Sequence, residues 1–146
     1  MNVGDILRFF ANRHPEKTAV HYLDRTVTYK ELNNRVNRLA NRYLSLGYRP
    51  NDKISILLQN CIEYLEIVFA LAKIGAISVP INFRLVDEEI KYIVNDSDSK
   101  ALILEKEFIE NVASVKSQLV VETDKYYVTG NDVADGFLSY EALFKG

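Results

Sequence analysis

The sequence contains few of the residues that usually build covalent links, metal sites or phosphate loops. Its 146 residues include one cysteine, Cys61, no tryptophan, three prolines and six glycines. A single cysteine excludes an internal disulfide and agrees with a reducing compartment. The glycines are dispersed, so neither of the two commonest glycine-rich motifs for nucleotide phosphates occurs. His14 and His21 stand in no metal-ligand spacing, and we predict neither a metal site nor a catalytic residue in this chain.

An excess of charge of one sign is also lacking. The chain has 20 Asp and Glu residues and 18 Lys and Arg residues, which gives a formal net charge of -2. The basic residues are scattered along the chain, which argues against a nucleic-acid partner. No apolar segment approaches the roughly 20 residues that cross a bilayer, and the N-terminus lacks the pattern of a signal peptide. We therefore expect a cytoplasmic protein with one folded core and no transmembrane segment.

The centre of the chain has the pattern of a β-α-β unit. Residues 53–58, KISILL, are apolar on both faces, as in a strand buried within a parallel sheet. A mostly apolar helix capped by Asn60 is predicted to follow and to end at Gly75, which can take the left-handed conformation of a helix end. A strand over 76–79 comes next, and Pro80 is expected to stop it by removing an amide donor.

A second helix is indicated just before this unit. Thr28 and Glu31 form a capping box, in which a hydroxyl and a carboxylate satisfy amides of the first helical turn. Apolar residues then recur at spacings of four and three up to Leu46. The other faces of the helix are interpreted as solvated, and they carry three arginines: Arg35, Arg38 and Arg42.

Shorter elements are predicted on either side. Towards the N-terminus we expect a hairpin of residues 18–23 and 26–29, preceded by a helix over 4–12 with an apolar face of Ile6, Leu7, Phe9 and Phe10. Towards the C-terminus we expect helices over 87–94 and 105–115, strands over 101–104 and 118–121, an irregular stretch over 123–136, and a last helix capped by Ser139. Because helices and strands alternate, we predict an α/β fold with a doubly wound, mostly parallel sheet and helices on both faces.

Two motifs add a family resemblance. Thr28-Tyr29-Lys30-Glu31-Leu32 is similar to L-T-Y-x-E-L, and the residues from Lys73 to Asn82, KIGAISVPIN, are similar to K-x-G-A-x-x-V-P-x-N. In this order and at this separation, they resemble the N-terminal part of the adenylate-forming superfamily of acyl-CoA synthetases, amino-acid adenylation domains and luciferases. The resemblance covers nearly the whole chain and places it in the large N-terminal domain of that fold.

The resemblance implies a reaction for a longer protein. Such enzymes use ATP and Mg²⁺ to convert a carboxylic acid into an acyl-adenylate, and then transfer the acyl group to a thiol such as that of CoA. The family's phosphate loop, its nucleotide and Mg²⁺ contacts, its catalytic lysine and its C-terminal domain lie downstream of the segment seen here. Residues 1–146 are therefore expected to be an N-terminal scaffold that is inactive alone and binds none of these ligands tightly.

The loop after Pro80 bears on the choice within the superfamily. Asn82-Phe83-Arg84 is similar to the N-x-R of acyl-CoA and aryl-CoA ligases, where adenylation domains usually have Asp at the position of Asn82. The resemblance implies that Arg84 contacts a nucleotide phosphate of CoA and that Asn82 shapes the loop. In the other interpretation, Arg84 ties the loop to nearby carboxylates such as Asp87 or Glu88. Val86 departs from the Thr or Ser cap that is usual in relatives.

The sequence leaves two alternative hypotheses about function. One is an amino-acid or aryl acid adenylation domain that loads a carrier protein in place of CoA. The other is a stand-alone α/β binding module without catalysis. If the chain is a piece of a larger domain, we expect apolar surface that promotes self-association.

Overall fold

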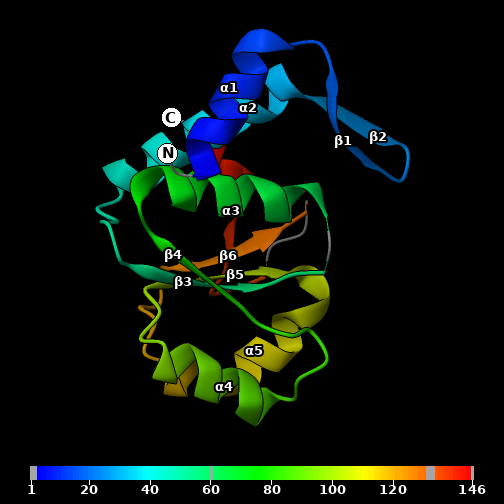
Figure 1. Ribbon diagram of the computed structural model, residues 1–146. Coiled ribbons are helices and arrows are strands. Elements are labelled where there is room, and N and C mark those ends of the chain that lie inside the picture. The colour runs from blue at the N-terminus through cyan, green and yellow to red at the C-terminus, as the bar shows by residue number, and fades with distance from the viewer. Residues whose placement is uncertain (1–2, 60, 131–133, 146) are drawn as a thin grey trace. The chain divides into compact units, whose positions relative to one another are not determined.

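The computed structural model describes residues 3–59, 61–130 and 134–145 (Figure 1). They form two compact units. Unit 1 is built from residues 1–50 and 60–76, and unit 2 from residues 51–59 and 77–145.

Unit 1 begins with a helix and a hairpin: α1 (Val3–Arg13), β1 (Thr18–Tyr22) and β2 (Arg25–Thr28). The two strands pair antiparallel with Tyr22 opposite Arg25. The predicted hairpin is therefore confirmed, but its turn is Leu23-Asp24 and not Asp24-Arg25. Leu23 has a φ of 55°, in the left-handed region that suits the twist of a two-residue hairpin turn.

Two longer helices complete unit 1: α2 (Tyr29–Ser45) and α3 (Ile62–Ile74). The capping box of α2 is confirmed, because Thr28 Oγ1 accepts from the Glu31 amide at 3.1 Å and Glu31 Oε1 accepts from the Thr28 amide at 3.0 Å. Cys61 stands at the cap position of α3 without a side-chain cap hydrogen bond, and the predicted cap, Asn60, lies outside the described residues. Gly75 ends α3 with a φ of 76°, as expected.

The predictions for the faces of these helices need two corrections. Arg35 is not on a solvated face of α2, because its guanidinium pairs with the buried Glu66 of α3. The predicted apolar face of α1 is also wrong in part. Leu7 is buried, whereas Ile6, Phe9 and Phe10 are exposed.

Unit 2 is organised around five parallel strands in the order β4-β3-β5-β6-β7. Their bounds are Lys53–Leu57 (β3), Ile77–Pro80 (β4), Ala101–Glu105 (β5), Tyr126–Thr129 (β6) and Leu138–Ser139 (β7). In chain order this is a 2-1-3-4-5 arrangement, the strand order of flavodoxin-like doubly wound sheets. The parallel sheet and the adjacency of β3 and β4 are confirmed.

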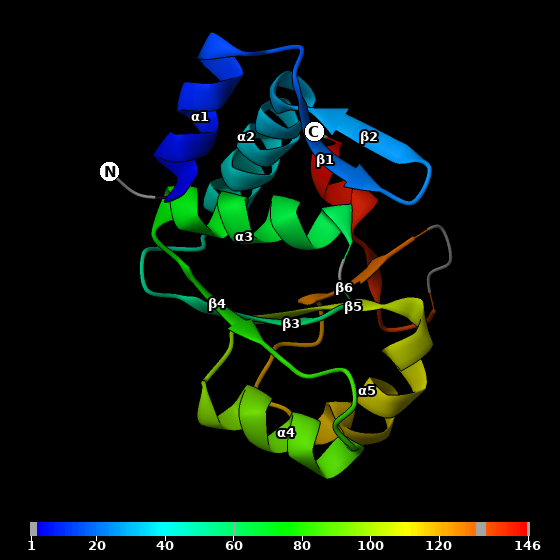
Figure 2. The same cartoon turned by 45° about the vertical axis from the view of Figure 1, so that its right-hand side comes forward.

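Two helices, α4 (Asp87–Asp96) and α5 (Ile109–Val115), lie on one face of this sheet (Figure 2). Short 3₁₀ turns flank α5 at Lys106–Phe108 (η1) and Lys116–Gln118 (η2), so the helix predicted over 105–115 is shorter than expected. Apolar side chains from the helices and the strands form one buried cluster, which includes Ile90, Val94, Leu102, Leu104, Val112, Val115 and Val128.

The C-terminal third of the chain departs most from prediction. No strand forms over 118–121, because the Asn95 side chain takes the hydrogen bonds of this segment: it donates to the Gln118 carbonyl at 3.0 Å and accepts from the Val120 amide at 2.8 Å. The next strand is β6, within the stretch predicted to be irregular. Ser139 belongs to β7 and caps no helix, and the last element is a 3₁₀ turn, Glu141–Phe144 (η3).

Pro80 also plays a different part from the one predicted. It is the last residue of β4, an edge strand, and it stands opposite Ile56 of β3. The missing amide of Pro80 does not end the pairing, since the Ile81 amide donates to the Ile56 carbonyl at 2.8 Å. Proline is tolerated there because only one side of an edge strand joins the ladder.

Candidate functional site

The loop after β4 leaves the carboxyl edge of the sheet in a defined turn. The Asn82 Oδ1 atom accepts a hydrogen bond from the Arg84 amide at 2.9 Å, and the Asn82 carbonyl accepts from the Leu85 amide at 3.1 Å. A side-chain oxygen that bonds the amide two residues on closes an Asx turn. The side chain of Asn82 thus holds the backbone of Arg84 in one conformation.

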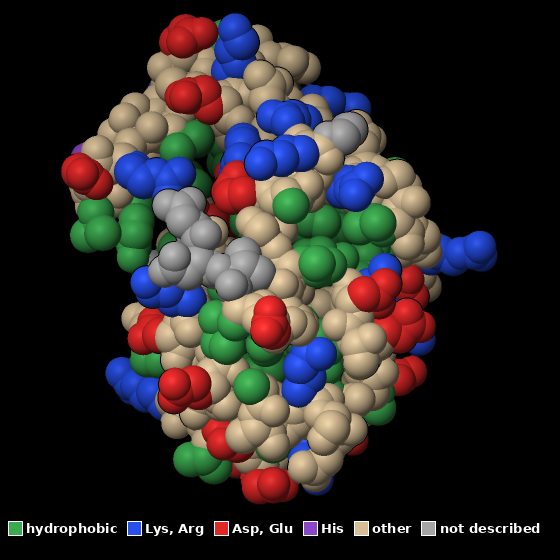
Figure 3. All heavy atoms as spheres, turned by 180° about the vertical axis from the view of Figure 1, so that it is seen from behind, with side chains coloured by type: hydrophobic (Ala, Val, Ile, Leu, Met, Phe, Trp, Pro, Cys, Tyr) green, Lys and Arg blue, Asp and Glu red, His purple; other side chains and the backbone are tan. Residues whose placement is uncertain are grey.

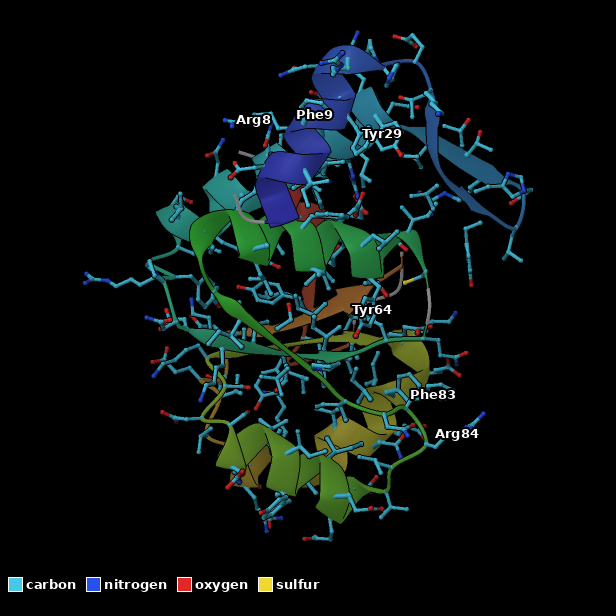
Figure 4. All side chains as sticks on the ribbon, viewed as in Figure 1. Arg8, Phe9, Tyr29, Tyr64, Phe83 and Arg84 are labelled. Atoms are coloured by element: carbon cyan, nitrogen blue, oxygen red, sulfur yellow. The ribbon has the colours of Figure 1, made fainter. Side chains whose placement is uncertain are left out.

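Arg84 projects from this turn beside an aromatic ring. Its guanidinium carbon lies 5.4 Å from the centroid of the Phe83 ring, and the Phe83 ring lies 6.4 Å from that of Phe108. Figure 4 shows Phe83 and Arg84 on the loop that follows β4. Both side chains are exposed. Contact with a ring face orients the planar cation while its N–H groups stay open to a ligand.

The carboxylates near Arg84 are engaged elsewhere. Asp87 accepts from Asn111 Nδ2 at 2.9 Å and from Ser114 Oγ at 2.7 Å, and the bond from Asn111, followed by the bond from Ser114, lowers the pKa of Asp87. Glu88 lies 3.8 Å from Lys91. Within the described ranges the Arg84 guanidinium forms no ion pair with Asp87 or Glu88, so the interpretation of Arg84 as a tie to these carboxylates is not supported.

Helix α4 starts without a side-chain cap from residue 86, because Val86 has no hydroxyl. The Glu89 carboxylate accepts from the Val86 amide at 3.2 Å, which is one half of a capping box. Valine has no acceptor for the other half. The departure at Val86 therefore leaves the helix start at Asp87 in place, and Arg84 stays on the loop before it.

A second polar group lies at the carboxyl ends of β3 and β5. Gln59 donates to Glu105 through its backbone amide and to Glu107 through its side-chain amide. In a sheet of this strand order, the switch point lies between these two strands, where ligands often bind. Here Gln59 links the end of β3 to Glu105 of β5 and to Glu107 of η1. Sequence reasoning missed this group, although the position of Gln59 and Glu105 at predicted strand ends was a usable signal.

Unit 1 contains a hollow of about 240 Å³ beside the start of α3. It is lined by residues of the hairpin and of α3, among them His21, Cys61, Tyr64 and Leu65. Burial, with a smaller contribution from Cys61, raises the pKa of Tyr64. No group of three His, Cys, Asp or Glu side chains in the described part of the chain is placed to hold a metal ion. None of the helices in that part is long and apolar enough to cross a membrane.

These features define a doubly wound α/β domain whose polar loops gather at the carboxyl ends of parallel strands. Comparison with known proteins identifies the family within this fold class. The sequence profile of the family described as AMP-binding enzyme matches residues 7–142. The chain belongs to this family.

The relatives that match the chain include CoA ligases. The 3-oxocholest-4-en-26-oate–CoA ligase of Rhodococcus rhodochrous is 38% identical, over 97% of this chain and 26% of its own length. The feruloyl-CoA synthase of an Amycolatopsis species is 41% identical, over 72% of this chain and 21% of its own length. The chain thus spans about a quarter of the curated relatives that it matches.

Solved structures agree with the sequence comparison. An anthranilate CoA ligase in complex with anthranoyl-AMP superimposes with a TM-score of 0.93 at 29% identity, over 99% of this chain and 28% of that chain. The coronafacic acid ligase of Pectobacterium brasiliense gives 0.90 at 27% identity, over 100% of this chain and 30% of that chain. The predicted α/β fold, with a parallel five-stranded sheet flanked by helices, is confirmed.

Proposed function

We propose that this chain is the N-terminal scaffold segment of an ATP-dependent, AMP-forming acyl-CoA ligase. In the proposed reaction, a carboxylate oxygen attacks the α-phosphorus of ATP, pyrophosphate leaves, and an acyl-adenylate forms. The thiol of CoA then attacks the acyl carbon and AMP leaves. The proposal is supported by membership of the AMP-binding enzyme family and by relatives that are CoA ligases.

The proposal that CoA is the acyl acceptor rests on the placement of Arg84. An exposed guanidinium, held by a neighbouring ring on a closed turn at a strand end, suits a phosphate group, which it can bind through two parallel N–H bonds. The acidic side chains nearby do not prevent this, because Asp87 and Glu89 are bonded to other groups. We therefore assign to Arg84 a nucleotide phosphate of CoA, and to Asn82 the shaping of the loop.

The remaining ligands belong to other parts of the proposed enzyme. Neither Arg84 nor Asn82 is given a role at the reacting acyl carbon. The contacts to ATP, Mg²⁺ and the carboxylic acid are assigned to the remainder of the longer protein. The 146-residue chain alone is then expected to form no acyl-adenylate and to bind ATP and CoA only weakly.

The decisive experiment uses the full-length enzyme with Arg84→Ala. We expect the apparent KM for CoA to rise by roughly tenfold or more, since a charge-assisted hydrogen bond contributes about 1.5–3 kcal/mol. The KM for ATP and the rate of pyrophosphate exchange are expected to stay near those of the parent. Equal changes in both KM values would assign Arg84 to the stability of the domain and remove the CoA role.

Two further variants sharpen the result. Arg84→Lys keeps the charge but loses the planar fork, so an intermediate KM for CoA is expected. Lys100→Ala removes an exposed cation that precedes β5, at the opposite end of the strands, and should leave both KM values unchanged. A loss of CoA affinity in Lys100→Ala as large as that in Arg84→Ala would point to a general effect of net charge.

A further inference from the structure

Helix α1 presents apolar side chains in two directions. Leu7 and Ala11 are buried, whereas the exposed fractions are 44% for Ile6, 48% for Phe9 and 37% for Phe10. Residues three and four apart lie on the same side of a helix, so Ile6, Phe9 and Phe10 form one exposed face. We call these three residues the α1 apolar face. The described part of the chain leaves these three side chains partly open to solvent.

The α1 apolar face is ordered by ring contacts. The Phe9 and Phe10 rings meet edge to face with centroids 5.5 Å apart, and the Phe10 ring stacks on Tyr29 at 5.4 Å. Figure 4 shows Phe9 and Tyr29 near one another, with Arg8 projecting on the other side of α1. Because these rings already hold one arrangement, little side-chain entropy remains to be lost when a partner covers them.

Cations border this face. Arg13 is seven residues after Ile6 and so lies on the same side of α1, with its guanidinium 5.2 Å from the Phe9 ring centroid. Two exposed lysines are close in the backbone to Tyr29, whose ring stacks on Phe10: Lys30 is the next residue, and the Lys17 carbonyl accepts from the Tyr29 amide. One acid, Glu16, falls between Arg13 and Lys17 in the sequence.

The net charge of unit 1 is positive, like the cations beside the α1 apolar face. It contains ten Lys and Arg residues against six Asp and Glu residues, a formal charge of +4, whereas unit 2 contains eight against fourteen. Figure 3 shows the opposite side from Figure 1, where Lys and Arg side chains also gather over the surface of unit 1. A partner with a negative surface is therefore favoured for unit 1.

We infer that the α1 apolar face binds the surface of an anionic lipid bilayer. Ile6 and Phe9 enter the boundary between headgroups and acyl chains, and Arg13, Lys17 and Lys30 lie against lipid phosphates, as in interfacial amphipathic helices. A second copy of the chain fits less well, because a symmetric contact through this face would bring its bordering cations close to their own copies. Such binding is independent of the proposed ligase reaction.

The test is sedimentation of the 146-residue chain with vesicles. Vesicles containing phosphatidylglycerol should carry the chain down at low salt, less so at high salt, and pure phosphatidylcholine vesicles should carry down much less. The double variant Ile6→Ser, Phe9→Ser should bind anionic vesicles about tenfold or more weakly. Lys17→Glu should also bind more weakly. The control, Tyr92→Ser, alters a residue of unit 2 that is 68% exposed and should not change binding.

Four results would overturn the inference. The first is equal binding by the parent chain and the Ile6→Ser, Phe9→Ser variant, with circular dichroism showing that both are folded. The second is no binding to anionic vesicles. The third is a dimer in sedimentation equilibrium that the same double variant abolishes, which would assign the face to a second copy. The fourth is loss of vesicle binding in a longer protein containing this chain, which would assign the face to the remainder of that protein.

Discussion

The Arg35 guanidinium of α2 donates two hydrogen bonds to the Glu66 carboxylate of α3, from Nε to Oε2 at 2.7 Å and from Nη2 to Oε1 at 3.0 Å. Glu66 is buried on a helix that is otherwise mostly apolar. Three further hydrogen bonds join polar groups of unit 1: Arg25 of β2 with Glu63 of α3 at 3.1 Å, and Lys73 of α3 with Asn33 of α2 at 3.0 Å and with Asn37 of α2. Polar side chains therefore connect α2 and α3 at more than one position.

We predict that Arg35→Ala destabilises the chain by about 3 kcal/mol, because the buried Glu66 carboxylate loses the charge and the two hydrogen bonds of the guanidinium. Urea unfolding followed by circular dichroism measures the loss. The double variant Arg35→Met, Glu66→Leu should recover most of it, since well-packed apolar residues can replace a buried ion pair. A single variant no less stable than the double variant would show that burial of Glu66 carries no penalty.

Thr28→Ala should lower the free energy of unfolding by about 1 kcal/mol, because the Glu31 amide loses the hydroxyl that caps α2. Thr28→Ser keeps the hydroxyl and serves as the matched control. Urea titration of the three proteins gives the difference. A loss of the same size in Thr28→Ser would locate the effect in the packing of the Thr28 methyl group and not in the cap.

Lys116 is predicted to stabilise unit 2 through its ring contacts. Its Nζ atom lies 4.5 Å from the Tyr126 ring centroid and 5.8 Å from that of Phe137. Lys116→Met, which keeps the apolar stem, should cost about 1 kcal/mol, the scale of a partly desolvated cation–π contact. Chemical unfolding of Lys116→Met and of Lys116→Arg, which preserves the cation, separates charge from packing. Equal stability of Lys116→Met and the parent would exclude a role for the charge.

Stability should fall in alkaline solution because of Tyr126. Burial raises the pKa of its hydroxyl from 10.0 to about 12. Between these values the unfolded chain releases a proton that the folded chain retains, so the contribution is complete below pH 10 and is lost as the pH rises through about 12. Unfolding free energies measured across this interval should fall less steeply in Tyr126→Phe. The same slope in both proteins would place the titrating group elsewhere.

The link between α4 and α5 should weaken in acid. Hydrogen bonds from Asn111 and Ser114 lower the pKa of Asp87 below 3.8, so their contribution is complete above the unfolded pKa and is lost as the pH falls through the folded value. Thermal unfolding from neutral pH down to about pH 2 should show a shallower acid dependence in Asn111→Ala, Ser114→Ala than in the parent. An unchanged acid dependence would remove Asp87 from the link.

Strand-end reasoning placed Asn82 and Arg84 together on a loop at the carboxyl edge of the sheet, and the structure has them there. It did not foresee that the Phe83 ring orients Arg84 or that Asp87 bonds to Asn111 and Ser114. Phe83 is the direct neighbour of Arg84, but the contact of its ring with the guanidinium depends on side-chain conformation. Asn111 and Ser114 are separated from the loop by α4 and β5, and local sequence carries no information about which distant side chains lie next to a loop.

Local rules also had limits for β6 and for α1. Residues 126–129, of which the first three are buried, form a strand between β5 and β7. Tyr, Val and Thr favour strands, but the glycine, Asn and Asp residues that follow led to the prediction of an irregular stretch. The run from Gln118 to Val121 also has a strand pattern, but the Asn95 side chain takes its hydrogen bonds. In α1, periodicity alone could not tell which of the apolar sides is covered.

By itself, the sequence determined the features whose causes lie within a few residues. Among them are the capping box of Thr28 and Glu31, the left-handed helix end at Gly75, and the strands and helices whose apolar pattern is unambiguous, because each depends on local hydrogen bonds or side-chain spacing. Only the tertiary structure decided that Glu66 is buried against Arg35, that Gln59 bonds to Glu105, and that Ile6, Phe9 and Phe10 are left exposed. Those outcomes depend on which surfaces meet after the chain has folded.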